Sequence, residues 1–181
     1  MVDHDGAGFV RDATAADASV VAELQSRCWK HDYPWPDEVF AAIAASDPEM
    51  QWARAVIAPP GPGYRLVVAT EGPDVVGFAA LAPAQDADSH GDEMEIVAWE
   101  VHPDHRGHGH GSRLLAALAD HARSIGASAL TMWIGHDDES RRFVLQDAGF
   151  APDSAHRTVQ MDEGWGLGEL TLRQVRLGAS V

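Results

Sequence analysis

Cysteine, basic residues and long apolar runs are all scarce in this sequence of 181 residues. Its single cysteine, Cys28, cannot form an internal disulfide or provide a metal site built from several thiolates. No apolar stretch approaches the roughly 20 residues that a membrane-spanning helix needs. Residues 1–5 lack the basic and apolar regions of a secretory signal. We therefore expect a cytoplasmic protein without membrane partners.

Basic residues are outnumbered by acidic ones. The sequence has 13 Lys and Arg against 28 Asp and Glu, which gives a formal net charge of −15 at pH 7. A nucleic-acid-binding protein needs a basic surface that displaces counterions from phosphates, so we exclude nucleic acid as a partner. The same acidity favours the approach of a cationic substrate and opposes that of a polyanion, although salt screens both effects beyond roughly 8 Å.

The apolar content of the sequence is sufficient for one core. Hydrophobic residues make up 45% of the chain, which is typical of a soluble globular protein. Neither an internal repeat nor a linker divides the sequence. Residues 1–181 are therefore predicted to form one domain.

Alternating and helical periodicities predict a mixed α/β fold. Thr14 is a candidate N-cap for a first helix, with Asp17 three residues later. Gly126 and Gly149 stand where glycine commonly ends a helix. The expected strands are 9–11, 65–70, 74–81, 93–101, 130–134, 157–161 and 169–177, and the expected helices are one that includes residues 20–28, 37–45, a turn at 52–57, 112–124 and 138–148.

The segment that carries the chemistry lies between the strand 93–101 and the helix 112–124. It reads Val-His-Pro-Asp-His-Arg-Gly-His-Gly-His-Gly-Ser over residues 101–112. Glycines at alternate positions let backbone N–H groups converge, and the following helix adds its unpaired first-turn N–H groups and its positive dipole end. This combination suits a pyrophosphate.

Two common phosphate-binding motifs do not fit this segment. A nucleotide-hydrolysing phosphate loop would end in Gly-Lys-Ser or Gly-Lys-Thr, which is absent here. A dinucleotide-binding fold would place its glycines after the first strand, whereas these follow the fourth. A purely structural turn before a helix is the remaining alternative.

The sequence resembles the GCN5-related N-acetyltransferase (GNAT) superfamily. The residues that carry the resemblance are Arg106-x-x-Gly109-x-Gly111 and the preceding Val101-x-Pro103. It extends over nearly the whole chain, from Phe9 to the final strand. The resemblance implies a central twisted mixed β-sheet of about seven strands flanked by about four helices. It also implies transfer of an acetyl group from acetyl-CoA to a primary amine of a small molecule or peptide by direct attack.

In this family the glycine-rich turn holds the pyrophosphate of CoA, and the pantetheine arm pairs with the backbone of the fourth strand, here near residues 99–101. A backbone N–H on that strand, near Trp99, is expected to contact the oxyanion. The resemblance therefore implies a cofactor site formed by Val101, Arg106, Gly107, His108, Gly109, His110, Gly111 and Ser112.

Glu95 is the candidate general base, because histone-type members of the family carry their base on this strand. An ammonium acceptor must lose a proton before it attacks a thioester. Regular strand alternation places Glu93, Glu95 and Trp99 on one face and Glu100 on the other. A bulge, which is frequent in this strand of the family, keeps Glu93 and Glu100 as candidates. A solvated carboxylate without a catalytic role is the alternative for Glu95.

One departure from the family pattern is Leu145, since many members carry at that position a tyrosine that protonates the leaving thiolate. The thiolate of CoA can leave unprotonated at neutral pH at a cost of about 2 kcal/mol, because a thiol has a pKa near 8.5. Ser140, Tyr33 and His136 are other conceivable proton donors. The departure also motivates a second hypothesis, a non-catalytic or regulatory acyl-CoA-binding module.

Four histidines and an aspartate crowd the same segment. Because clustered His and Asp side chains can bind a divalent metal, a metal-binding protein is a third hypothesis. A turn that cradles phosphate with its backbone directs its side chains outward, however, so we expect no metal. The residues are His102, Asp104, His105, His108 and His110.

The acceptor pocket is expected between the first two helices, where Trp29, Tyr33 and Trp35 are candidates for binding the substrate. Aromatic rings beside acidic residues suit an alkyl ammonium, although Trp29 and Trp35 could equally belong to the core. A homodimer is a further expectation, because dimers are frequent in the family.

Overall fold

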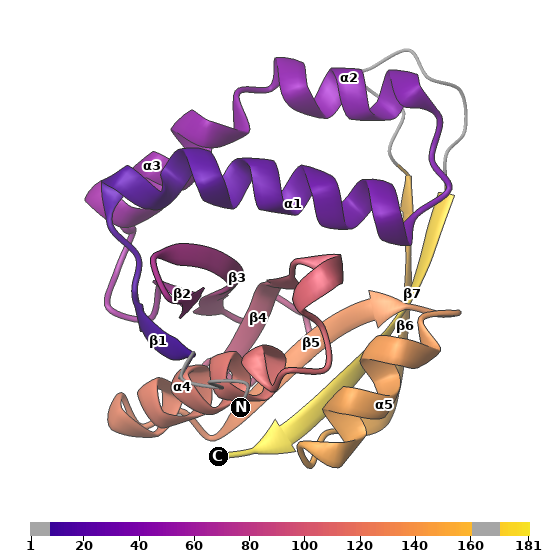
Figure 1. Ribbon diagram of the computed structural model, residues 1–181. Coiled ribbons are helices and arrows are strands. Elements are labelled where there is room, and N and C mark those ends of the chain that lie inside the picture. Colours follow the sequence, from indigo (N-terminus) through magenta and orange to yellow (C-terminus); the bar gives the residue numbers. More distant parts are fainter. Residues whose placement is uncertain (1–7, 161–170) are drawn as a thin grey trace, which may run out of the picture.

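The computed structural model describes residues 8–160 and 171–181. Within these residues the chain forms a seven-stranded mixed sheet and five α-helices (Figure 1). The strands are β1 (Phe9–Asp12), β2 (Arg65–Glu71), β3 (Asp74–Pro83), β4 (Glu93–Val101), β5 (Ala129–Gly135), β6 (Ala151–Gln160) and β7 (Thr171–Ser180). The helices are α1 (Ala18–Asp32), α2 (Asp37–Ala45), α3 (Pro48–Ile57), α4 (His110–Ser124) and α5 (Glu139–Asp147), with short 3-10 turns at Ala15–Asp17 and Pro103–His105.

The strand order across the sheet is β1-β2-β3-β4-β5-β7-β6. Every neighbouring pair is antiparallel except β4 and β5, which run parallel because α4 connects them as a crossover. The mixed sheet and its seven strands confirm the predicted fold class.

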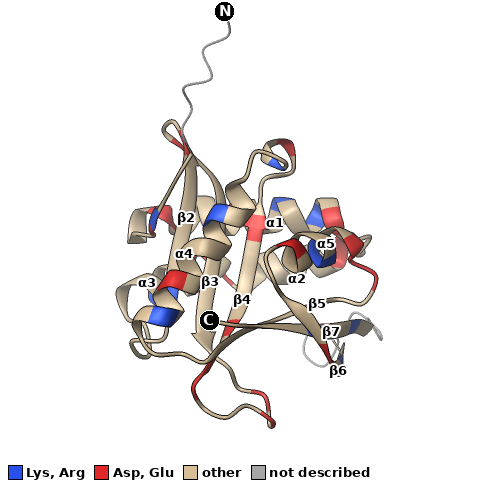
Figure 2. Ribbon diagram, turned by 90° about the horizontal axis from the view of Figure 1, so that it is seen from below, with Lys and Arg blue, Asp and Glu red and all other residues tan. Residues whose placement is uncertain are grey.

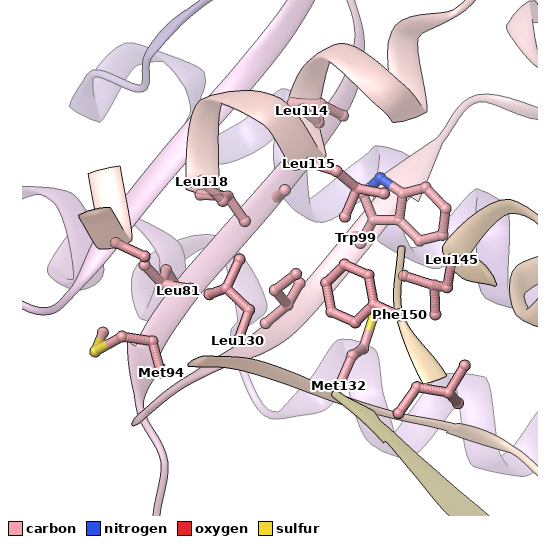
Figure 3. Close-up of a cluster of buried hydrophobic side chains, with 14 of the residues drawn as sticks. Leu81, Met94, Trp99, Leu114, Leu115, Leu118, Leu130, Met132, Leu145 and Phe150 are labelled. Carbon is pink, nitrogen blue, oxygen red and sulfur yellow. The ribbon is translucent and has the colours of Figure 1, made fainter. Parts of the chain in front are cut away.

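Helices cover both faces of the sheet, and each face has its own apolar cluster (Figure 1). On one face, Leu24 and Cys28 of α1 pack on Phe78 of β3. On the other face, Leu114 and Leu118 of α4 join a larger cluster that also contains side chains from β4, β5, α5 and β7 (Figure 3). The sheet is therefore the common wall of two cores.

The helical region between β1 and β2 is larger than predicted. The expected turn at 52–57 is a helix of ten residues, Pro48–Ile57, which brings the number of described helices to five instead of about four. Its start is marked in the sequence by Asp47, whose carboxylate accepts a hydrogen bond from the Met50 N–H, and by Pro48 in the first turn. Asp47 followed by Pro48 is thus the signal in the sequence that predicts a full helix here instead of a single turn.

The final antiparallel pair is confirmed, although β6 begins six residues earlier than expected, at Ala151. Pro152 is tolerated because β6 is the edge strand of the sheet, where a missing N–H donor breaks no ladder. The pairing with β7 shifts between Pro152 and His156. The predicted ends of this pair at 161 and 169–170 lie outside the described residues.

Among the described residues, no helix is long and apolar enough to cross a membrane.

Candidate active site

The sheet opens between its two parallel strands. In the part of the chain that the structure describes, the pairing of β4 with β5 ends where Glu95 meets Thr131. Beyond that point the remaining residues of β4 pair only with β3. One backbone edge of β4 is therefore left without a strand partner along residues 96–101.

Strand β4 also carries a bulge just after this point. Ala80 of β3 pairs with Ala98, and its neighbour Leu81 pairs with Ile96, so that Val97 is an extra residue on β4. Val97 is correspondingly 53% exposed in the middle of an otherwise buried strand.

The bulge reverses the side-chain alternation along β4. Met94 and Trp99 both join the core under α4, whereas Glu100 lies on the α1 face, where it contacts Trp29. By alternation from Met94, Glu95 lies on the same face as Glu100. The bulge that was kept as an alternative for this strand is therefore present, and Glu95 shares a face with Glu100 instead of with Trp99.

The glycine-rich turn follows β4 and leads into α4. Gly107 and Gly109 adopt positive φ angles of 82° and 78°, which a side chain would disfavour. Gly109 is the residue before α4, and no side chain caps the helix there. The first-turn N–H groups of α4 are thus available to an anion, as expected from the sequence.

Gly111 has a different reason to be glycine. It lies in the first turn of α4, and a Cβ atom there would come within 2.9 Å of Cζ2 of Trp99. The Trp99 indole N–H donates a hydrogen bond of 3.1 Å to the Gly111 carbonyl. Trp99 is also part of the core between α4 and the sheet (Figure 3). Its side chain therefore fixes the position of the helix that follows the turn.

Two arginines occupy the open edge of β4. Arg141 of α5 donates to the Trp99 carbonyl over 2.8 Å, and Arg106 of the turn donates to the Val101 carbonyl over 3.0 Å. In an antiparallel pair the N–H and C=O of one residue point to the same side, so the Trp99 N–H also faces this edge. The edge therefore presents both donors and acceptors to the gap beside β5.

Asp32 at the end of α1 links the two arginines. Its carboxylate accepts two hydrogen bonds from Arg106, of 2.7 and 2.9 Å, and lies 3.4 Å from Arg141. Burial alone would raise the pKa of Asp32, but hydrogen bonds from Arg106 and His31 together outweigh it, so the pKa is lowered. The motif that identified Arg106 gives no signal for Asp32, the carboxylate that pairs with it, because the two residues are 74 positions apart in the sequence.

Glu100 is the most deeply buried carboxylate of the site, at 5% exposure. One of its oxygens accepts from the indole N–H of Trp29 at 3.1 Å, and the other accepts from Arg141 at 2.7 Å. Burial raises the pKa of Glu100, while the charge of Arg141 opposes that increase. Both oxygens are engaged, so Glu100 has a structural partner on each side.

Glu95 is in a different environment. Its side chain is half-buried, and the nearby charges that affect it are those of Arg157, Asp86 and Arg176. Burial raises the pKa of Glu95, Arg157 lowers it, and Asp86 raises it further. A carboxylate with a raised pKa is a stronger base than an ordinary glutamate.

The three aromatic candidates form one half-buried group beside Glu100. Tyr33 stacks on Trp35 with ring centroids 4.4 Å apart, and Trp29 meets Trp35 edge-on at 6.0 Å. Burial raises the pKa of Tyr33, and Arg141 opposes this. The rings and Glu100 thus form one wall on the α1 face of β4.

The remaining predicted residues are placed as follows. Leu145 is fully buried in the core under α5 and supplies no proton donor. Ser112 is exposed in the first turn of α4, and Glu93 is half-buried at the start of β4. His102 faces Arg27 at 3.1 Å, whereas His105, His108 and His110 converge on Glu71 of β2.

Comparison with protein families gives one match over most of the chain. The model of the acetyltransferase (GNAT) family matches residues 19–150. This range includes all of α1 except its first residue, the open edge of β4, the glycine-rich turn and α5.

Individual relatives agree with this match. The L-amino acid N-acyltransferase MnaT of Escherichia coli is 28% identical over 93% of this chain and 93% of its own length. The N-alpha-acetyltransferase RimI of Mycobacterium tuberculosis is 28% identical over 76% of this chain and 74% of its own. The PaiA N-acetyltransferase of Thermoplasma acidophilum, solved in complex with coenzyme A, has the same fold with a TM-score of 0.77 at 12% identity, covering 97% of this chain and 99% of that structure.

Proposed function

Because the chain belongs to the acetyltransferase (GNAT) family, we propose that it transfers an acetyl group from acetyl-CoA to a primary amine of a small molecule or peptide. The observation that carries the proposal is the unpaired edge of β4, which ends in a glycine-rich turn at the N-terminus of α4. Such an edge can pair with the amides of a pantetheine arm, and such a turn can hold a pyrophosphate.

In this proposal the turn residues Arg106 to Ser112 surround the pyrophosphate. Gly107 and Gly109 allow the backbone to fold closely around it, and the first N–H groups of α4 face its charge. The pantetheine arm lies along residues 99–101 of β4. Arg141 and Arg106 must then release the carbonyls of Trp99 and Val101, since these are the acceptors that the arm would use.

The chemical step begins with the acceptor in its ammonium form. Glu95 takes a proton from it, directly or through water, and leaves a neutral amine. The nitrogen lone pair forms a bond to the thioester carbon, and the developing oxyanion is met by the backbone N–H of Trp99. The C–S bond then breaks, the electron pair leaves with the sulfur as the CoA thiolate, and the acetylated nitrogen gives its second proton to solvent water.

The structure favours Glu95 over Glu100 as the base. Both oxygens of Glu100 are engaged by Trp29 and Arg141, and a carboxylate in an ion pair with arginine is a weaker base. Burial raises the pKa of both carboxylates, so the preference rests on their partners: Glu95 makes no ion pair among the described residues. Trp29, Tyr33 and Trp35 then form the wall of the acceptor pocket.

The acceptor class that we propose rests on the net charge of the chain and on the names of its relatives. The relatives named above are an L-amino acid N-acyltransferase and an N-alpha-acetyltransferase, so an α-amino group is the first acceptor to test. A net charge of −15 favours acceptors that carry further positive charge. We also expect the protein to be cytoplasmic and to form a homodimer.

The experiment is a thiol-release assay with acetyl-CoA and a panel of amino acids, cationic amines and short peptides, with mass spectrometry of the product. Release that depends on the acceptor and yields an acetylated amine supports the proposal. Acetyl-CoA binding without release from any acceptor in the panel would instead favour the non-catalytic acyl-CoA-binding module, which Leu145 motivates.

A further inference from the structure

The histidines of the glycine-rich turn meet a carboxylate that is distant in the sequence. Glu71 ends β2, and His105, His108 and His110 come from the turn between β4 and α4. One ligand atom from each of these four residues lies within 4.8 Å of every other. The histidine side chains of the turn, which were expected to point away from its phosphate-binding backbone, therefore converge on the carboxylate at the end of β2.

The distances within the cluster are short on the Glu71 side. His105 Nδ1 is 2.7 Å from Glu71 Oε2, and His110 Nε2 is 3.4 Å from the same oxygen. Ligand atoms around a tetrahedral zinc ion lie roughly 3.4 Å apart, given bond lengths of about 2.0–2.2 Å. The four ligand atoms lie within 4.8 Å of one another, so a small shift that separates His105 Nδ1 from Glu71 Oε2 and brings the more distant atoms closer would place all four around such a centre.

His110 provides an independent observation. Its side chain is 2% exposed, and its Nε2 atom is buried without a hydrogen-bond partner among the described residues, since the contact with Glu71 lacks hydrogen-bond geometry. An unsatisfied polar atom in a buried position is costly. A cation between Nε2 and the Glu71 carboxylate would satisfy it.

We propose that Glu71, His105, His108 and His110 form a binding site for one divalent transition-metal ion of the zinc class. Three imidazoles and one carboxylate are ligands that suit zinc, and the absence of thiolates from the set argues against the softest metals. Magnesium and calcium prefer sites formed entirely by oxygen. The bound ion would connect the glycine-rich turn to the end of β2.

Arg113 is the group that binding must displace. It donates to His110 Nδ1 over 3.2 Å and to the His108 carbonyl over 3.0 Å. If Nε2 of His110 binds the metal, Nδ1 must carry the proton, so Arg113 must turn away from that nitrogen. Replacing Arg113 with glutamine should therefore leave metal affinity unchanged or increase it.

The test is a metal titration of the full chain without an affinity tag, after treatment with a chelator and in the absence of acetyl-CoA. Cobalt(II) serves as the spectroscopic probe, because a tetrahedral site gives intense visible absorption, and zinc competition then gives the zinc affinity and stoichiometry. We expect one ion per chain. His108→Ala and Glu71→Gln should each weaken binding on the order of tenfold or more.

His90→Ala is the matched control, because His90 is exposed in the loop between β3 and β4 and takes no part in the cluster. It should bind metal as the wild type does. His108 is itself exposed, so its replacement should preserve the fold, which circular dichroism will verify. Wild-type protein that binds no stoichiometric metal, or variants at 108 and 71 that bind with wild-type affinity, would overturn the proposal. Neither result depends on acetyl transfer.

Discussion

Arg141 shows at the scale of one residue how the candidate site is held together. Its guanidinium contacts the carboxylates of Glu100, Asp138 and Asp32 and the Trp99 carbonyl, and it joins α5, α1 and β4. Its side chain is 13% exposed, and that of Glu100 is 5% exposed. Burying such a pair is costly, yet removing one member is worse, because the other charge is then left in the protein interior.

Replacing Arg141 with alanine should therefore lower the free energy of unfolding by about 3–5 kcal/mol. Urea unfolding monitored by tryptophan fluorescence measures the loss. The double variant R141M/E100Q should recover most of it, because it also removes the charge of Glu100, the most deeply buried of the carboxylates that Arg141 contacts. Arg123→Ala, which removes an exposed ion pair with Asp120, should cost no more than about 1 kcal/mol. Equal losses for the Arg141 and Arg123 variants would contradict this account of the pair.

Gly111 and Trp99 provide a second prediction at the same scale. An alanine at 111 places its Cβ against Cζ2 of Trp99, so the variant should lose about 1–3 kcal/mol of stability although alanine favours helices. Thermal unfolding measures the change. Gly61→Ala is the control, since nothing lies within 4 Å of a Cβ atom there. Trp99→Phe removes the benzo ring that contains Cζ2. The alanine should therefore cost less in that background, and an equal cost in both would refute the steric explanation.

At the scale of elements, β1 and α1 are connected by one carboxylate. Asp17 accepts two hydrogen bonds of 2.8 Å from Arg11 and one of 2.7 Å from the Thr14 N–H. These hydrogen bonds hold the pKa of Asp17 below its ordinary value, with Arg11 as the largest cause. A lowered pKa in the folded state stabilises the protein above the unfolded pKa of about 3.9 and loses this contribution as the pH falls further.

Asp17→Asn should accordingly destabilise the protein by about 1–2 kcal/mol at pH 7. The difference between wild type and variant should shrink as the pH falls below about 4, because the carboxylate is then protonated in the unfolded chain while Arg11 keeps it ionised in the folded protein. Denaturant unfolding at a series of pH values measures this difference. A gap that stays constant down to pH 2 would show that the charge of Asp17 is not its cause.

The elements also show what the sequence could and could not predict. Strands β2 to β5 and helix α4 could be predicted from the periodicity of apolar residues and from glycines at their ends. The turn before α4 could be predicted from its motif. The bulge at Val97 could not be located from the sequence, because it depends on the register between β3 and β4. That register decides which carboxylates share a face with Trp29. The convergence on Glu71 likewise depends on contacts between segments 34 residues or more apart.

At the scale of the whole molecule, acidic residues lie on helices, strands and loops alike (Figure 2). The formal net charge of −15 should attract cationic acceptors over long distances. At the turn that would receive the CoA phosphates, the positive charges of Arg106 and Arg113 are instead close at hand. We therefore expect distant charges to affect the approach of the acceptor and local ones to affect the binding of the cofactor.

Raising the salt concentration should therefore lower kcat/KM for a cationic peptide more than for an uncharged amine of similar size. Salt shortens the Debye length from roughly 30 Å at 0.01 M to 3 Å at 1 M and so removes the attraction between distant charges. Steady-state rates over this range, with saturating acetyl-CoA, measure the effect. Parallel losses for both acceptors would show that the acidic surface does not steer the substrate.

The proposed role of Glu95 as the base is tested by comparing acetylation rates of the wild type and Glu95→Gln from pH 6 to 10. Glu93→Gln serves as the control, because Glu93 precedes the bulge on the same face of β4. We expect the Glu95 variant to lose between ten- and 10⁴-fold in kcat at neutral pH, and least at high pH, where the acceptor amine deprotonates without help. The raised pKa of Glu95 also predicts that, as the pH is lowered, the wild-type rate begins to fall at a higher pH than it would with an ordinary glutamate as the base. A Glu95 variant that retains the wild-type rate at every pH would contradict the account and leave the base to be found elsewhere.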